Sequence, residues 1–216
     1  YWYMQKGPVE VNPGAVLTLG PNDDGWFGTI VNHGQINVGT VAQHTWRMLN
    51  YVEAASSDGY HGHFTNDAGA LVNHVAGNLM LGSEQSYLNN ITKKCRVVNN
   101  GEIRTSGGRF YFSAVSTLEG TGVVTCAGGT PELLGGLSDF AGEIVVTGGT
   151  PQVANIESFP GTLRLVDGVM TSTTLASFRG TTIYDLKSRE TLPFDIEGKG
   201  WTDLPQGTRV IVETGD

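Results

Sequence analysis

His61-Gly62-His63 is a pattern whose residue types suit metal chemistry. Histidines at i and i+2 of a strand point to one face, where two imidazoles can begin a zinc site. A structural zinc site needs four ligands, and no third or fourth ligand is evident near this pair. The pattern therefore favours a polar loop beside Tyr60, and we predict no metal site here.

Asp23-Asp24-Gly25 offers the oxygen ligands that calcium prefers, in what we expect to be an acidic turn. A lone acidic turn is usually only a turn, and the nonapeptide Gly-Asp repeats of calcium-binding β-rolls are missing. We predict no calcium site and no other cofactor.

Acid–base chemistry on polysaccharides would need two carboxylates about 5–10 Å apart, or a base beside a cation that neutralises the sugar carboxylate. Three carboxylates lie close together in the C-terminal part of the sequence: Asp185, Asp195 and Glu197. Arg164 and Arg179 are candidates for the cation, although a solvated turn explains each of them as well. No Ser-His-Asp order and no phosphate-binding loop is present, so we predict no catalytic residues.

Four aromatic residues in or near the irregular stretch 21–64 are candidates for surface contacts with a sugar or a protein: Trp26, Trp46, Tyr51 and Tyr60. Packing of the same side chains against the rest of the chain is an equally good interpretation.

The elements that would position these residues are set by a repeat. The phrase Phe-x-Gly occurs as Phe140-Ala-Gly142, Phe159-Pro-Gly161 and Phe178-Arg-Gly180, at intervals of 19 residues. A β-rich run follows each glycine. A fixed period of about 20 residues is the signature of a solenoid, because three short strands and their turns use that many residues per coil.

Further glycines extend the period in both directions. The predicted coil anchors are Gly14, Gly34, Gly77, Gly101, Gly120, Gly142, Gly161 and Gly180. We predict an all-β, right-handed parallel β-helix of about 19–24 residues per coil, with residues 1–216 as one domain. The interval 34–77 has room for two coils and includes an irregular insertion at about 40–70, and the tail 187–216 is less regular. An antiparallel sandwich would not explain the repeated interval of 19.

Equivalent positions of neighbouring coils stack in such a fold. We therefore expect a column of Phe140, Phe159 and Phe178, with the glycines of the phrase allowing a tight turn. Asn32, Asn73 and Asn99 each follow a valine, and we expect them to form a ladder of side-chain amides.

Three segments resemble the autotransporter-associated β-strand repeats: 118–125, 139–150 and 158–168. The resemblance covers about residues 100–186 well and 10–100 loosely. It implies a right-handed β-helical passenger domain of a bacterial surface protein. Similar coils occur in phage tailspikes and fibres, so the resemblance implies an architecture more than a role.

Composition narrows the function classes. The chain is 39% hydrophobic and 16% charged, with 31 glycines and a net charge of −8. This composition is too apolar for disorder, and the acidic surface argues against nucleic acid as a partner. The basic cluster Lys93-Lys94-Cys95-Arg96 is interpreted as a solvated turn. No run of about 18 apolar residues is present, so we expect no membrane insertion by this segment.

We therefore expect an extracellular, non-enzymatic rod that mediates surface attachment at the cell surface. Its expected partners are other protein chains, in a longer rod or a homo-oligomer, and cell-surface glycans. One alternative is a virion component, such as a tail fibre, spike or capsid-decorating protein, that is completed by symmetric partners. A second alternative is a polysaccharide lyase or glycosidase of the β-helix class. Because the chain starts without an initiator Met, we expect a processed product or a piece of a longer protein.

Overall fold

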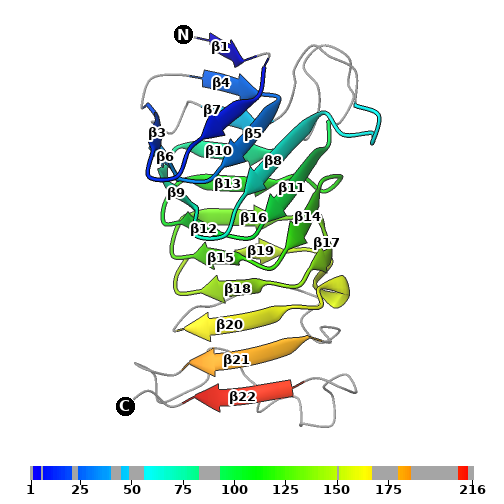
Figure 1. Cartoon of the computed structure of the whole chain (residues 1–216). Coiled ribbons are helices and arrows are strands. Elements are labelled where there is room, and N and C mark those ends of the chain that lie inside the picture. Colours follow the sequence, from blue (N-terminus) through cyan, green and yellow to red (C-terminus); the bar gives the residue numbers. More distant parts are fainter. Residues whose placement is uncertain are drawn as a thin grey trace.

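The chain forms a rod of stacked coils in a computed structural model (Figure 1). The structure describes residues 2–5, 7–20, 24–39, 45–48, 56–82, 93–149, 151–166, 180–185 and 209–213. Within these ranges the strands form three sheets, here called sheets A, B and C, and all neighbouring strands are parallel.

Sheet A has seven strands, in the spatial order β1 (Trp2–Gln5), β4 (Asp24–Phe27), β7 (Thr45–Met48), β10 (Asn78–Leu81), β13 (Arg109–Phe112), β16 (Thr130–Leu133) and β19 (Gln152–Val153). Sheet B has six strands, in the order β2 (Val9–Val11), β5 (Thr29–Asn32), β8 (Gly62–Asn66), β11 (Cys95–Asn99), β14 (Thr117–Gly120) and β17 (Gly136–Phe140). Sheet C has nine strands, in the order β3 (Val16–Leu19), β6 (Gln35–Gly39), β9 (Leu71–Ala76), β12 (Glu102–Thr105), β15 (Val123–Cys126), β18 (Glu143–Val146), β20 (Thr162–Val166), β21 (Thr181–Asp185) and β22 (Arg209–Glu213).

Each complete coil takes one strand from sheet A, one from sheet B and one from sheet C, in that order along the chain. The 3₁₀ helix η1 (Ile156–Ser158) follows β19 and replaces the sheet B strand of that coil. Crossovers between parallel strands are right-handed. The predicted right-handed parallel β-helix is therefore confirmed.

The core is a continuous apolar column enclosed by the three sheets. Side chains alternate between the inside and the outside along most strands, as in β18, where Ile144 and Val146 are fully buried. Register keeps like positions together, so that Ile144 lies between Val124 and Leu163 of the neighbouring coils. Each coil thereby buries its apolar face against its two neighbours.

One column of side chains marks the corner between sheets B and C. In three successive coils it is occupied by Asn32, Asn66 and Asn99, which are all fully buried. Further along the rod it continues with Phe140 and Phe159, whose rings stack with centroids 5.8 Å apart. The expected stacking of these two phenylalanines is confirmed, and Phe178 lies outside the described residues.

Asn66, and not Asn73, completes the asparagine ladder. The Asn32 amide donates to Asn66 Oδ1 at 2.8 Å, and the Asn66 amide donates to Asn99 Oδ1 at 2.8 Å. The prediction for Asn73 is wrong because this residue is the third of β9, on the outer face of sheet C. Its amide lies 3.5 Å from Asn37 Oδ1 of the preceding coil.

In most coils a glycine stands two residues after the corner position, because backbone segments approach closely there. A Cβ on Gly142 would overlap the Gly122 carbonyl oxygen, and a Cβ on Gly161 would overlap the Gly142 carbonyl oxygen. Gly180 occupies the same corner in the next coil, since Thr181 N donates to the Gly161 carbonyl oxygen at 3.2 Å.

Three of the predicted anchors need correction. Gly122, and not Gly120, precedes the sheet C strand of its coil, because Val123 pairs with Glu102 and Glu143. Gly77 lies at another corner, between β9 and β10 of sheets C and A. In the first coil the corner position is occupied by Ala15 and not by Gly14. The Ala15 carbonyl oxygen is the atom that a Cβ on Gly34 would meet.

The interval 34–77 holds one coil where two were predicted. Leu71 of β9 pairs directly with Gln35 of β6, so these two strands belong to consecutive coils. The extra length comes from residues 49–61, between β7 and β8. Within the predicted insertion at 40–70, residues 45–48 and 62–66 form the strands β7 and β8.

Candidate functional site

Two long insertions leave the rod at the same corner of consecutive coils. The first insertion, residues 49–61, joins β7 of sheet A to β8 of sheet B, and the second, residues 82–94, joins β10 to β11. In the next coil the same corner needs only residues 113–116 between β13 and β14. The structure describes 56–61, 82 and 93–94 of these insertions, which place their bases side by side.

Backbone hydrogen bonds tie the two bases together. The His61 and Gly62 amides both donate to the Lys94 carbonyl oxygen, at 2.9 and 3.2 Å. The Lys94 amide lies 3.4 Å from His61 Nδ1, to which it donates. Burial, followed by the charges of Lys93 and Lys94, lowers the pKa of His61, so its neutral acceptor form is favoured. We call His61, Gly62 and Lys94 the insertion junction.

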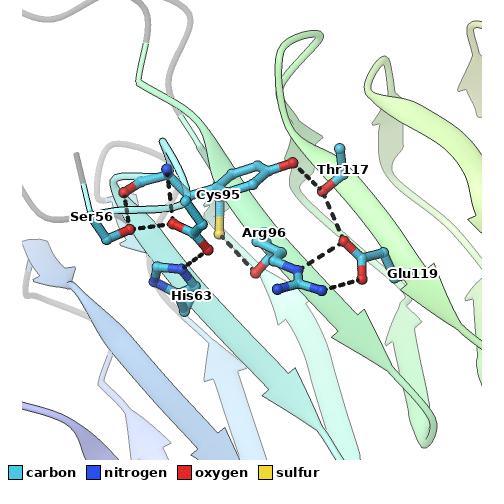
Figure 2. A network of polar contacts seen from close by, with 8 residues as sticks. Ser56, His63, Cys95, Arg96, Thr117 and Glu119 are labelled. Carbon is cyan, nitrogen blue, oxygen red and sulfur yellow. Dashed lines mark hydrogen bonds and ion pairs between the residues drawn. The ribbon is translucent and has the colours of Figure 1, made fainter.

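The base of the first insertion is fastened to the outer face of sheet B by the polar network in Figure 2. Asp58 accepts from Ser56 and lies 2.9 Å from His63 Nε2 of β8. The Thr117 hydroxyl of β14 donates to the Tyr60 hydroxyl oxygen at 3.1 Å. The hydrogen bond from Ser56, then the one with His63, holds the pKa of the exposed Asp58 well below its usual range, so the carboxylate stays ionised.

An Arg–Glu pair continues the network across two coils. Arg96 Nε and Nη2 of β11 donate to the two Glu119 carboxylate oxygens of β14, at 2.9 and 2.8 Å. This bidentate pair raises the pKa of Arg96 and lowers the pKa of Glu119, chiefly through the hydrogen bonds and also through charge. Figure 2 shows the pair beside Thr117, on the face that the first insertion reaches.

The exposed Lys94 lies beside the half-buried Tyr60 at this site. The Lys94 ammonium lies over the Tyr60 ring, 5.9 Å from its centroid. The Tyr60 ring also meets the His63 ring edge-on, with centroids 6.2 Å apart. Among the residues that the structure describes, Lys94 forms no ion pair with a carboxylate.

The predicted contact residues have different locations. Tyr60 lies at the site, as described above. The prediction of surface contact for Trp46 is wrong, because this side chain is 4% exposed and stacks on Phe27 inside the rod. It faces the core in register with Leu79 of the next coil. Trp26 lies in β4, with a side chain outside the described set, and Tyr51 lies outside the described residues.

The residues considered for catalysis do not come together in the described part of the chain. Arg164 is held by Glu143 of the preceding coil at 2.7 Å, which makes this pair a link between β18 and β20. Arg179, Asp195 and Glu197 lie outside the described residues, and only the backbone of Asp185 is described, in β21. The expected acidic turn is wrong for Asp24 and Gly25, because both belong to strand β4, and Asp23 lies outside the described residues.

The two histidines of the His61-Gly62-His63 pattern have separate partners. His61 faces the Lys94 amide, whereas His63 pairs with Asp58. Within the described ranges no group of three or more His, Cys, Asp or Glu side chains is arranged to hold a metal ion. Both cysteines are free and buried, and burial raises the pKa of Cys95 and raises that of Cys126 to about 12.

The sequence interpretation missed most of the network. Arg96 and Glu119 are 23 residues apart, about one coil, and that spacing between opposite charges was the available signal. Asp58 and Thr117 carried no such signal, because their contacts depend on how the first insertion folds back onto sheet B. Lys94 was interpreted as part of a solvated turn, whereas it joins the two insertions.

Among the described segments no helix is long and apolar enough to cross a membrane. Comparison with protein-family models, with curated proteins and with solved structures finds no match to this chain.

Proposed function

We propose that this protein is an extracellular, non-enzymatic β-helical rod that attaches to a surface or to other chains through its two insertions. The observation that supports this proposal is the position of the insertions, which leave one corner in consecutive coils and are joined at their bases. Contacts between the two bases hold the ends of both insertions close together, so that one ligand can meet residues of both.

The remaining surface suits a scaffold. Ion pairs link successive coils on the outer faces, as in Arg109–Glu132 on sheet A and Arg164–Glu143 on sheet C. The corner between sheets B and C stays short because its glycines allow close backbone approach. A regular rod whose two longest described connections begin at one corner suits a scaffold that carries its contact residues at that corner.

Attachment can be measured with beads that carry the full chain, on surfaces coated with glycans or with proteins. In the test variant, a copy of the short connection 113–116 replaces residues 82–94. The control variant is Arg104→Gln, on the outer face of sheet C. We expect the parent and the control to attach to at least one surface and the test variant to lose attachment at an unchanged melting temperature. Equal attachment by all three proteins would contradict the proposal.

A polysaccharide lyase is the second candidate function. The observation that favours it is the grouping of Tyr60 and His63 with Lys94 on one face, since lyases combine a proton acceptor with a cation beside the sugar carboxylate. Incubation with a panel of acidic polysaccharides separates the two functions. Shortening of any of these polymers, lost in His63→Gln, would replace the rod proposal with the lyase.

A further inference from the structure

We propose that the insertion junction and the neighbouring Tyr60 bind anionic polysaccharides, with the Lys94 ammonium as the cation and the Tyr60 ring as the surface on which a sugar stacks. This inference rests on the proposed function and names the class of ligand for the same site. It uses only side chains that the structure describes.

The first argument is the contrast between Lys94 and the arginines of the rod. Arg96, Arg109 and Arg164 lie on the outer faces of the sheets. Each donates to a glutamate of a neighbouring coil, with nitrogen–oxygen distances of 2.6–2.9 Å. Lys94 is exposed and forms no such pair with a described residue. Its charge is therefore available to a carboxylate or sulfate group from outside.

The second argument is the local charge. Lys93 and Lys94 lie beside His61, and their charges contribute to the lowered pKa of that histidine. The nearby acidic groups are already engaged, Asp58 with His63 and Glu119 with Arg96. Screening limits a charge to a range of about 8 Å at physiological salt. An anion at the junction thus meets a small local excess of positive charge, although the whole chain has a net charge of −8.

The third argument is the fixed aromatic ring. The hydrogen bond with Thr117 and the contact with the His63 ring hold Tyr60 against sheet B, while the residue stays half-buried. A ring held in this way presents its exposed part to a ligand at little entropic cost. The apolar faces of pyranose rings stack on such surfaces, so a ring beside an ammonium fits an acidic sugar residue.

The charge density of the ligand decides between two classes of polyanion. Double-stranded nucleic acid carries one charge per about 1.7 Å and is bound by arrays of cations. The junction offers one unpaired cation at the surface of an acidic rod, which suits a polymer with about one charge per sugar. Polysaccharide is therefore the better match.

The test is a binding titration of the full chain with four probes: polygalacturonate, dextran sulfate, neutral dextran and single-stranded DNA. We expect binding to one or both acidic polysaccharides and none to dextran. Binding to only one of the two identifies the acidic group as a carboxylate or a sulfate. Lys94→Gln should weaken this binding about tenfold, as expected for the loss of one charged hydrogen bond.

Arg104→Gln is the matched control, because it removes the same charge from the outer face of sheet C. It should leave the affinity within about twofold of the parent. Tyr60→Phe keeps the ring and should bind, whereas Tyr60→Leu should weaken binding. Equal losses in Lys94→Gln and Arg104→Gln would show non-specific attraction and overturn the inference, as would equally tight binding of DNA. If no acidic polysaccharide binds while the beads still attach, this inference fails and the proposed function stands.

Discussion

Asn66 connects three coils through a single buried side chain. It accepts from Asn32 and donates both to Asn99 and, at 3.1 Å, to the Glu102 carbonyl oxygen. The asparagines at this corner thus link neighbouring coils and also fix the start of the following sheet C strand. Their burial makes each of these hydrogen bonds costly to lose, because water cannot replace the missing partner.

Asn66→Ala is expected to lower the free energy of unfolding by about 2–4 kcal/mol, because it leaves polar groups of both neighbouring asparagines without a partner. Urea denaturation measures the loss. Asn73→Ala is the matched control and should change stability by less than about 0.5 kcal/mol, since its amide lies on the outer face. Equal effects of the two substitutions would contradict the ladder described here.

His74 is a buried titratable group inside the rod. Its ring is fully buried, with Nδ1 3.0 Å from the Thr105 hydroxyl and Nε2 3.3 Å from the Gly77 carbonyl oxygen. Burial lowers the pKa of His74 despite the opposing effect of nearby backbone carbonyls. Below about pH 6.5 the His74 imidazole is therefore protonated in the unfolded chain, whereas the folded chain binds this proton less readily.

We expect stability to be highest above this pH and to fall as the pH decreases from about 6.5 to 5, because protonation favours the unfolded state. Melting temperatures at a series of pH values measure the slope. Val38 and Val146 occupy the same inward-facing column as His74 in other coils, so valine is a suitable replacement at this position. His74→Val should therefore reduce the dependence of the melting temperature on pH. His61 will contribute a smaller part, since burial lowers its pKa in the same direction. A slope that is unchanged in His74→Val would rule out this assignment.

At the scale of the elements, the recurring phrase has a physical explanation. The Phe140 and Phe159 rings each fold over the glycine two residues later, so a Cβ on Gly142 would also meet the Phe140 ring. The asparagine coils follow the same rule, as in Asn32-His-Gly34 and Asn99-Asn-Gly101. At these four corners a buried side chain is followed by one free position and then a glycine, whereas Asn66 is followed by its glycine one residue later.

Gly142→Ala should destabilise the protein by about 1–3 kcal/mol, because the added methyl group overlaps a backbone oxygen that cannot move without disturbing the next coil. Gly136→Ala is the control, since its added Cβ would make only ordinary contacts with Ser116 and Thr117. Thermal unfolding of the two variants provides the comparison. A loss in Gly136→Ala as large as that in Gly142→Ala would show that close approach at the corner is not the cause.

The sequence predicted these elements where the coils have equal length. The β-helix, the positions of Gly142 and Gly161 and the Phe140–Phe159 stack all followed from intervals of 19 residues. The prediction of the asparagine ladder was wrong for Asn73, because a Val-Asn pair can place its asparagine on either the inner or the outer face of a strand. Asn-x-Gly would have excluded Asn73, but it would also have missed Asn66, whose glycine comes one residue later.

At the scale of the whole molecule, the insertions explain what sequence periodicity did not predict. A corner accepts extra residues without disturbing the strands on either side, so β7 and β10 remain in register although long insertions follow both. Loop closure costs little more for a long loop than for a short one. The sequence interval between two corner glycines therefore includes the length of any insertion as well as the length of the coil. For this reason the interval does not give the number of coils.

Energetic coupling in this rod should decrease with the number of coils between two sites, because each coil contacts only its neighbours. Phe159→Ala is expected to cost about 3–5 kcal/mol through the cavity that it leaves, and Phe140→Ala should have a similar cost. The two side chains stack on each other, so the double variant should differ from the sum of the single variants by about 0.5–3 kcal/mol.

Asn66 provides the reference for this coupling, since its coil lies several coils away at the same corner. Combining Asn66→Ala with Phe159→Ala should give a loss within about 0.5 kcal/mol of the sum. Urea denaturation of the three single and two double variants, with hydrogen exchange in β8 and β18, measures both terms. Coupling of equal size for the near and the distant pair would mean that the rod unfolds as one rigid unit, in which a coil responds to changes far beyond its neighbours.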